Sequence, residues 1–364
     1  MGLGSFINWL QAVIARRTLR GGPFIQYFGF APIWAGDFIF GFLNKFDIAT
    51  SSASSRIDRI VLQARSKSEQ CAVPNEQKLA IVTGANSGIG YETAKAIGRA
   101  GYYTILACRN PEAGMEAVER LERQTGLTDR FKFMELDLAS IESVDKFVHD
   151  IKAREGPVDL LVNNAGLMGC PFSKTKDGVE LQFGTNHVGH FVLTTGLLEK
   201  LKQAKDGARI VVLSSIAAFL QSDIDYERVE LKPRYHEWKS YGISKLANLL
   251  FATALARKLE GTGVMVNAAH PGTVATGLMR FVCVSSVFTM LQNIVLDSPQ
   301  VGSLTSIYLA LSPEVESVTG KMYARGIERE MHPSGNDIAK QDNLWEYTEN
   351  LVASIRKTKK QFYC

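Results

Sequence analysis

The residues with the clearest chemical potential are Tyr241 and Lys245, which lie four positions apart in the stretch YGISK. On a helix, this spacing places the phenol and the ammonium on one face. A nearby ammonium stabilises phenolate, so the pair predicts a lowered tyrosine pKa and proton transfer to or from a substrate oxygen near neutral pH. A solvated helix face is the alternative interpretation, because the same spacing is common on such faces.

A second informative stretch runs from Lys78 to Gly90 and has the sequence KLAIVTGANSGIG. It predicts a buried strand, a tight turn and the start of a helix. Gly84 permits the sharp turn, Gly88 lets the backbone approach a pyrophosphate, and Gly90 lets the helix pack closely on its strand. The helix N-terminus would offer N–H groups to the anion. An ordinary glycine loop is the alternative, but a second strand at βαβ spacing favours a dinucleotide site.

The elements around these residues alternate between strand and helix. Seven short strands are predicted at 79–83, 103–108, 131–136, 158–163, 209–215, 264–269 and 321–323. Helices are predicted at 88–100, 111–124, 140–154, 179–203, 239–260, 299–311 and 336–355. This alternation predicts a Rossmann-type α/β fold with a doubly wound, parallel, seven-stranded sheet.

The composition fits one large domain with extensions. The 364 residues are 46% hydrophobic and 21% charged, as in globular proteins. A formal net charge of +4 is too small to indicate a nucleic-acid partner. The five cysteines are scattered and form no C-x-x-C pair, which argues against a disulfide framework and a zinc site and favours a reducing compartment.

The first part of the chain differs from the rest. Residues 1–36 contain no acidic residue, and a short basic amphipathic pattern precedes an aromatic-rich apolar run at 23–43. The run includes Asp37, whose burial in hydrocarbon would be costly, so a segment lying in or dipping into a membrane is favoured over a clean span. A targeting peptide is the alternative, because an acid-poor, arginine-bearing N-terminus followed by serines also fits one.

The pattern divides the chain into four regions. They are a membrane-associating or targeting segment at 1–49, a linker at 50–77, the Rossmann domain at 78–330, and a C-terminal helix and tail at 331–364. An apolar stretch at 277–298 fits a substrate lid, a second membrane contact or an ordinary core helix. If the first segment is the anchor, a chain beginning near Cys71 should leave the membrane and stay folded.

Taken together, five motifs resemble the short-chain dehydrogenase/reductase family. In chain order they are TGANSGIG at 83–90, NNAG at 163–166, the serine pair 214–215, the Tyr241 and Lys245 pair, and Pro-Gly at 271–272. The resemblance covers about residues 78–330. Finer stretches, such as LACRN at 106–110 and GTNHVGH at 184–190, are similar to the retinol-dehydrogenase-like branch, which includes a dehydrogenase of the chloroplast inner envelope import machinery.

The resemblance implies a role for each residue of a catalytic group. Tyr241 would donate or accept the proton, and Lys245 would tune it and hold the nicotinamide ribose. Ser215 would hydrogen-bond the substrate oxygen, while Ser214 would be structural. Asn186 would hold a water that relays protons from Lys245.

The resemblance also implies a set of cofactor-binding positions. They are Gly84, Asn86, Ser87, Gly88, Ile89, Gly90, Arg109, Asp137, Leu138, Asn163, Asn164, Ala165, Tyr241, Lys245, Pro271, Gly272 and Thr273. At the end of the second strand, Arg109 stands where an NAD enzyme would carry an acid, so NADP(H) is predicted as the cofactor.

Three further residues allow two interpretations each. Asp137 would contact the adenine amino group, although an aspartate at a strand end is also an ordinary cap for the following helix. His187 and His190 lie three apart on a helix and could face one metal. They are interpreted as structural, and no metal is predicted, because no acidic or cysteine ligand lies near them in the sequence.

The resulting hypothesis is an NADP(H)-dependent oxidoreductase that interconverts a lipophilic alcohol and its aldehyde or ketone by hydride transfer. A retinoid-like, isoprenoid, fatty or sterol substrate would be delivered from a membrane. The alternatives are an NADPH-sensing, non-catalytic partner of a membrane complex and a light-driven enzyme similar to protochlorophyllide reductase. The endoplasmic reticulum is the favoured location, and a plastid or mitochondrial membrane is the alternative. The sequence leaves open whether the protein forms a homodimer.

Overall fold

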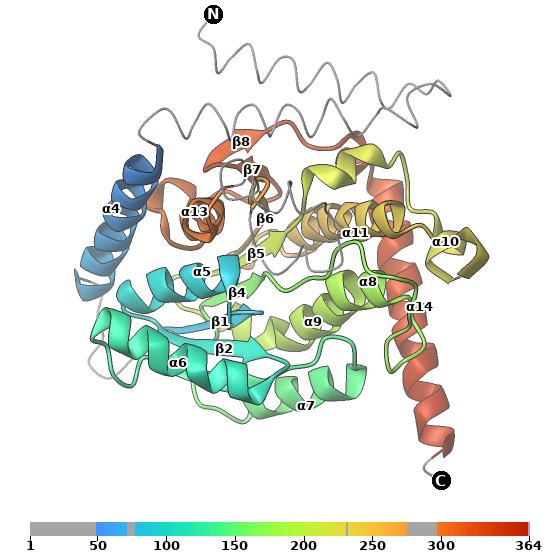
Figure 1. The fold of residues 1–364 in the computed structure, drawn as a ribbon, viewed down its shortest axis with the longest axis horizontal. Helices are drawn as coiled ribbons and strands as arrows, with labels where there is room; N and C mark the ends of the chain where they lie inside the picture. Colours follow the sequence, from blue (N-terminus) through green and yellow to red (C-terminus); the bar gives the residue numbers. More distant parts are fainter. Residues whose placement is uncertain (1–48, 71–76, 231, 275–296, 363–364) are drawn as a thin grey trace, which may run out of the picture.

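The structure is a computed structural model, and it describes residues 49–70, 77–230, 232–274 and 297–362. Figure 1 shows a central sheet with helices packed on both faces. The strand order is β3-β2-β1-β4-β5-β6-β7-β8. Strands β2 and β3 are added on one side of β1, and the chain then crosses to the other side of β1, where β4 and the later strands are added. The predicted doubly wound α/β sheet is therefore confirmed. The strands are β1 (Leu79–Thr83), β2 (Tyr103–Cys108), β3 (Phe131–Glu135), β4 (Leu160–Asn163), β5 (Ala208–Leu213), β6 (Val264–His270), β7 (Met322–Ala324) and β8 (Ile327–Arg329).

The helices form two layers, and each layer has its own hydrophobic core. One core contains apolar side chains of α4, α5, α6 and α13, and the other contains those of α7, α9, α11 and α14. The long helices are α4 (Ala49–Gln70), α5 (Gly88–Arg99), α6 (Pro111–Thr125), α7 (Ile141–Lys152), α9 (Gly189–Lys202), α11 (Glu237–Lys258), α13 (Pro299–Leu311) and α14 (Ile338–Phe362). Short helical segments are α8 (Leu181–Phe183), η1 (Gly184–Val188), η2 (Ile216–Leu220), α10 (Tyr226–Glu230), η3 (Lys232–Arg234), η5 (Pro313–Val315) and η6 (Pro333–Asn336).

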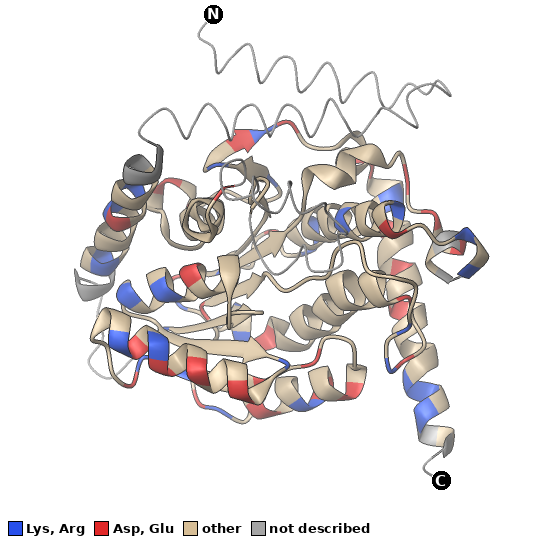
Figure 2. Ribbon diagram, viewed as in Figure 1, with Lys and Arg blue, Asp and Glu red and all other residues tan. Residues whose placement is uncertain are grey.

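The central strands are mainly apolar, as expected for a parallel sheet that has both faces covered. In β1, Leu79 and Ile81 join the core under α7, α9 and α11, whereas Ala80 and Val82 join the core under α5 and α13. Successive residues thus serve opposite layers, as strand geometry requires. Figure 2 shows the charged residues gathered on the helices and outer loops, with the middle of the sheet uncharged.

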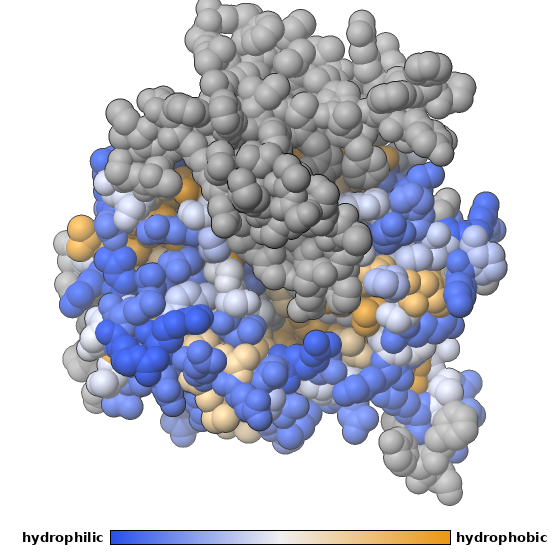
Figure 3. Space-filling view, in the orientation of Figure 1, coloured by the Kyte–Doolittle hydropathy of each residue, from blue (hydrophilic) through white to orange (hydrophobic). Residues whose placement is uncertain are grey.

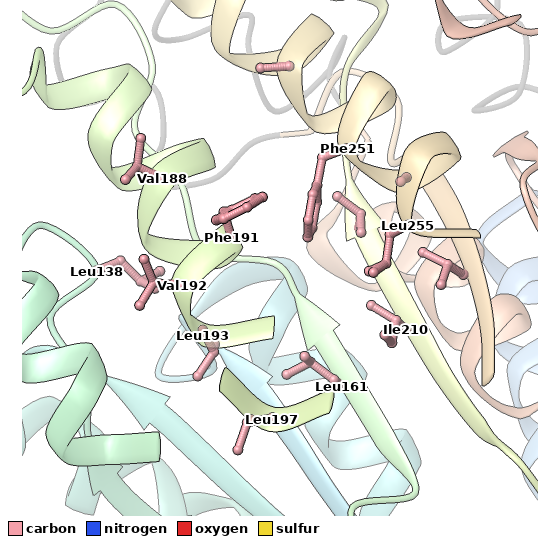
Figure 4. Packing of buried hydrophobic residues seen from close by; sticks show 14 of the residues in the cluster. Leu138, Leu161, Val188, Phe191, Val192, Leu193, Leu197, Ile210, Phe251 and Leu255 are labelled. Carbon is pink, nitrogen blue, oxygen red and sulfur yellow. The ribbon is translucent and has the colours of Figure 1, made fainter. Parts of the chain in front are cut away.

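Aromatic packing fixes α9 and α11 against each other. Phe191 of α9 and Phe251 of α11 have ring centroids 5.5 Å apart, and Figure 4 shows both rings in the space between the two helices. Trp345 of α14 packs edge-on against Phe191 and stacks on Phe251 at 5.9 Å. Such pairs contribute stability beyond the area that they bury. The two helices that lead to the candidate catalytic residues therefore have a rigid mutual position.

The prediction of a linker at 50–77 is wrong for most of this range, because residues 49–70 form the helix α4. Ile57, Ile60 and Val61 are buried in the core formed with α5 and α13, and Figure 1 shows α4 beside these two helices. The serine-rich composition suggested a loop, but these apolar residues recur at helical spacing. Tertiary packing decides the structure here, since serine has only a weak helix preference.

Two other elements differ from their prediction. Strand β8 is an eighth strand and pairs antiparallel with β7. It was missed because its residues, Ile-Glu-Arg, include two charged side chains and show no strand pattern. The single helix predicted at 179–203 consists instead of α8, the π-helical turn η1 and α9, so a wider turn interrupts it at its start.

The surface of the described part is mainly polar. Figure 3 shows hydrophilic residues over most of the described area of this face, with smaller hydrophobic areas between them. Among the described helices, none combines the length and the apolar character needed to cross a membrane. The predicted segment at 1–49 lies outside the described residues except for Ala49, and the apolar stretch at 277–298 lies outside them except for its last two residues.

The packing of α4 changes the expectation for a shortened chain. A chain beginning at Cys71 lacks three buried aliphatic side chains, each of which contributes about 1.5–3 kcal/mol when fully buried. Its free energy of unfolding should be lower by about 4 kcal/mol or more than that of a chain beginning at Ala49. Urea unfolding of the two proteins measures the difference. Equal free energies of unfolding would show that α4 adds nothing to the stability of the fold.

Candidate active site

The glycine-rich turn has the geometry that its sequence predicts. Gly84 and Gly88 have φ values of +65° and +60°, in the left-handed region that favours glycine. A Cβ on Gly90 would lie 2.5 Å from both the Gly84 carbonyl oxygen and Asn164 Nδ2, so a side chain is excluded there. Helix α5 begins at Gly88, and the side chain of Ser87 makes no capping bond, which leaves the first N–H groups to an anion. The turn therefore fits the pyrophosphate of a dinucleotide.

The loop after β4 holds this turn from the neighbouring strand. Asn164 Nδ2 donates to the Thr83 carbonyl oxygen at 2.7 Å. The backbone N–H groups of Asn164 and Ala165 both donate to Thr83 Oγ1 at 2.9 Å. Asn163 is buried and donates to Thr194 Oγ1 at 2.8 Å. The predicted residues of β4 thus lie at the point where the strand order reverses, which is where such sheets bind ligands.

Tyr241, Lys245 and Ser215 lie together at the start of α11. Tyr241 and Lys245 are 5% and 4% exposed, and the tyrosine hydroxyl hydrogen-bonds the Ser215 side chain. Lys245 Nζ lies 5.8 Å from the Tyr241 ring centroid and donates to the Leu213 carbonyl oxygen at 3.2 Å. Ser214 Oγ donates to the Lys245 carbonyl oxygen at 2.7 Å. The second serine thus contacts the tyrosine, while the first holds the helix.

Comparison with known proteins decides the family. A family model described as short chain dehydrogenase matches residues 78–283. The chain belongs to the short-chain dehydrogenase/reductase family. It is 40% identical over 295 residues to retinol dehydrogenase 14 of Homo sapiens, covering 77% of this chain and 87% of that protein. It is 41% identical over 290 residues to the short-chain dehydrogenase TIC 32 A, chloroplastic, of Brassica napus, covering 76% and 89%.

A solved structure with a similar fold also matches this chain. A putative uncharacterized protein from Mycobacterium Paratuberculosis is 31% identical and has a TM-score of 0.59, covering 76% of this chain and 93% of that one. The protein is thus an oxidoreductase of this family that is related to retinol dehydrogenases.

Next to the tyrosine of this dehydrogenase lies a small apolar cluster. Met168, Ala217 and Tyr241 form its buried part, and Leu220 and Trp238 pack against it while staying partly exposed. These residues come from the loop after β4, from η2 and from the first turns of α11. The candidate site therefore has an apolar wall beside the Tyr241 phenol.

Asn186 lies in the π-helical turn η1, close to Lys245. Its Nδ2 donates at 2.9 Å to the Leu167 carbonyl oxygen and to Ser244 Oγ, and its Oδ1 accepts from the Leu167 N–H at 2.8 Å. A Cβ on Gly166 would lie 3.2 Å from Asn186 Oδ1 and 3.6 Å from Lys245 Nζ, so both of these side chains lie beside Gly166. The wider turn carries the asparagine to this position, and π-turns often occur at functional sites.

Arg109 lies exposed at the end of β2. Together with Asn110, Pro111 and Glu112 it lines a pocket of about 420 Å³. The Asn110 side chain accepts from the Ala113 N–H and thereby caps α6. The pocket therefore lies where β2 leads into α6, and an arginine side chain forms part of its wall.

Asp137 and Leu138 follow β3. Asp137 Oδ1 accepts from the Ala139 N–H at 3.1 Å, and Oδ2 lies 3.1 Å from Lys176 Nζ. Ser140 rather than Asp137 caps α7. Leu138 is buried against α9, where its carbonyl oxygen lies so close to Gly189 that a Cβ there would be 2.3 Å away. These contacts hold the loop in place without using Asp137 as a helix cap.

The pKa predicted for Tyr241 is wrong in direction. Burial raises the pKa of Tyr241 to about 12, and the hydrogen bond with Ser215 opposes this only in part. Burial also lowers the pKa of Lys245 to about 8. Lys245 Nζ donates to the Leu213 carbonyl oxygen, and burial rather than the ammonium is the main influence on the pKa of the phenol. The phenol is therefore protonated at neutral pH, the form that can donate a proton.

His190 links the glycine turn to Asn186, a role that its sequence position did not indicate. Its Nδ1 lies 2.9 Å from the Asn186 carbonyl oxygen, and its Nε2 lies 2.9 Å from Thr83 Oγ1. A carbonyl oxygen only accepts, so the proton of the neutral ring is on Nδ1, and Nε2 accepts from Thr83. His187 is likewise buried and bonds Thr348 through Nε2 at 3.0 Å. Within the described residues, no group of three or more His, Cys, Asp and Glu is arranged to hold a metal ion.

Sequence reasoning missed Thr83 and His190 as supports of the site. Thr83 is the last residue of an apolar strand, and its hydroxyl contacts a loop about 80 positions further along the chain. The pattern GTNHVGH at 184–190 carried the only local signal, since a buried imidazole in a helix requires a hydrogen-bond partner.

The buried histidines predict a loss of stability in mild acid. Burial lowers the pKa of His187 to about 3 and that of His190 to about 4, so the unfolded chain binds protons below pH 6.5 that the folded chain does not. The free energy of unfolding should therefore fall as the pH falls from 6.5 toward 4. In the variant His190→Gln, the difference in the free energy of unfolding between pH 6.5 and pH 5 should be smaller by about 1–2 kcal/mol. Urea unfolding at both pH values measures it, and an unchanged difference would contradict the neutral state of His190.

Proposed function

We propose that this dehydrogenase is an NADP(H)-dependent enzyme that interconverts a lipophilic alcohol and its aldehyde or ketone. The observation that carries the proposal is the buried pair of Tyr241 and Lys245, with the partly buried Ser215 next to the phenol and an apolar wall beside it. Relatives named retinol dehydrogenase, about 40% identical to this chain, support a substrate of this class. The alternative is an NADPH-sensing, non-catalytic partner of a membrane complex, because a competent site does not establish physiological use.

The nicotinamide of the bound cofactor supplies or accepts the hydride. Tyr241 donates the phenolic proton to the carbonyl oxygen during reduction, and its raised pKa keeps the phenol protonated at neutral pH and well above it. Ser215 donates a hydrogen bond to the same oxygen and so orients the carbonyl group. Lys245, whose side chain lies with that of Asn186 beside Gly166, keeps a positive charge near the phenolate that forms. Asn186 would hold the water that returns a proton toward Lys245.

The apolar wall supports a lipophilic substrate. Met168, Leu220 and Trp238 offer apolar surface next to Tyr241, so a hydrocarbon body can leave water while its carbonyl group reaches the hydroxyl groups. Retinoid-like, isoprenoid, fatty and sterol compounds all have this combination of a large apolar body and one oxygen. Such compounds partition into membranes, and residues 1–49 would bring the enzyme to them. The endoplasmic reticulum is proposed as the location, with a plastid or mitochondrial membrane as the alternative.

Replacing the proton donor tests the function directly. Tyr241→Phe should lower kcat with long-chain and polyene aldehydes by about a hundredfold or more, because proton transfer contributes rate factors of this size. NADPH binding should change little, since the ring is kept. Oxidation of NADPH and tryptophan fluorescence measure the two properties. Full activity in this variant would refute the role of Tyr241, and no activity of the unaltered protein across the aldehydes would favour the sensor.

The cofactor preference depends on Arg109. A guanidinium group at the end of β2 can pair with the 2′-phosphate of NADP(H), whereas NAD(H) calls for an acid there. Arg109→Ala should lower kcat/KM for NADPH by about 10–100-fold and leave kcat/KM for NADH nearly unchanged, since a charged hydrogen bond contributes about 1.5–3 kcal/mol. A higher kcat/KM with NADH in the unaltered protein, with the same cofactor ratio in the variant, would contradict the assignment.

A further inference from the structure

An unusual residue occupies the turn between β7 and β8. The hairpin has the two-residue loop Arg325–Gly326, with φ values of +55° and +69°. Two positive φ values are the pattern of a type I′ turn, whose first central position favours asparagine, aspartate or glycine. An arginine in the left-handed region is uncommon and strained. The structure of the turn alone therefore does not explain why arginine is present.

The side chain of Arg325 reaches the loop after β6. Its Nη2 donates to Asp297 Oδ2 at 2.8 Å, in an ion pair whose side chains are 16% and 6% exposed. The Asp297 N–H donates to the Thr273 carbonyl oxygen at 3.0 Å, and Asp297 pairs with Val274 in a parallel bridge. A Cβ on Gly272 would lie 3.1 Å from Asp297 Oδ2 and 3.6 Å from Arg325 Nη2. The ion pair is therefore in direct contact with the loop Pro271–Thr273.

Helix α4 holds the same turn from its other side. Arg56 Nη1 and Nη2 donate to the carbonyl oxygens of Arg325 and Gly326 at 3.4 Å and 3.2 Å. The Arg56 guanidinium carbon also lies 5.6 Å from the ring centroid of Tyr308, on α13. A continuous series of polar contacts thus runs from Arg56 through Arg325 and Asp297 to the Pro271–Thr273 loop.

We propose that Arg56, Arg325 and Asp297 are positioning residues for the cofactor, which hold the Pro271–Thr273 loop in its binding conformation. All three lie outside residues 78–283, the part matched by the family model. The inference rests on the proposed cofactor role of this loop. Through these contacts α4 belongs to the cofactor site as well as to the core.

The physical basis is a change in the population of the competent loop conformation. Gly272 has φ of +85° and Thr273 is tied to Asp297, so the loop has few alternatives while the ion pair is intact. When the pair is broken, a smaller fraction of molecules has the competent conformation, and the apparent affinity for the cofactor falls by that fraction. The proton-transfer groups on α11 are not part of these contacts and stay in place.

Arg325→Asn is the sharpest variant. Asparagine favours the left-handed conformation of this turn, so the hairpin is kept while the guanidinium group is removed. Arg56→Ala removes the contact from α4. The matched control is Asp58→Asn. Asp58 on α4 forms an ion pair with Arg99 on α5 at 2.8 Å. The substitution therefore removes another contact of α4 with the domain and leaves the β7–β8 turn unchanged. Arg56→Lys keeps one donor and should rescue part of the effect.

The experiment measures NADPH and NADH dissociation constants, kcat, KM and the thermal midpoint of the full chain and its variants. For the dinucleotide that the unaltered protein binds, Arg325→Asn and Arg56→Ala should raise the dissociation constant about three- to tenfold, the range expected for coupling between contacting elements. Asp58→Asn should leave it unchanged within twofold, even where its thermal midpoint falls equally. Equal affinity in all variants would overturn the positioning role and leave the proposed function intact. If the unaltered protein binds neither dinucleotide, both are overturned.

Discussion

The hydroxyl group of Thr83 is the contact on which the cofactor end of the site depends. Where β1 and β4 end, the chain leaves the sheet toward opposite layers, and two loops must stay within hydrogen-bond distance of each other. Thr83 Oγ1 accepts two N–H groups of the β4 loop and donates to His190 at the start of α9. Because each buried donor must find an acceptor, one oxygen atom fixes three segments from different parts of the chain.

The part of the candidate site around Tyr241 and Lys245 depends on the rigid packing of α9, α11 and α14. The aromatic contacts of Phe191, Phe251 and Trp345 hold these helices together, and the π-turn before α9 then brings Asn186 next to Lys245. Burial on this scale is also what sets the chemistry. It raises the pKa of Tyr241 to about 12 and lowers the pKa of Lys245 to about 8, whereas the attraction between a phenolate and an ammonium alone would shift each pKa in the opposite direction.

Local features were predictable from the sequence, and features that depend on distant contacts were not. The glycine turn and the apolar strands follow from residue types at neighbouring positions, and the order of the motifs indicated which residues would meet at the carboxyl ends of the strands. The helix at 49–70 was missed because its serines suggested a loop, although Ile57, Ile60 and Val61 recur at helical spacing. The pKa of Tyr241 was misjudged because burial is a tertiary property. The contact of Arg56 with Arg325 joins residues 269 positions apart, and no local pattern indicates it.

The hairpin at the end of the sheet also bears on self-association. An edge strand exposes unpaired backbone groups that a second sheet can use. One of the two edges of this sheet is β8, which is three residues long, and Glu328 on β8 forms an ion pair with Lys321, the residue before β7, at 3.2 Å. A short, charged edge gives a neighbouring strand few backbone partners and requires it to displace hydrated charges. The β8 edge is therefore poorly suited to pairing with a strand of a second copy.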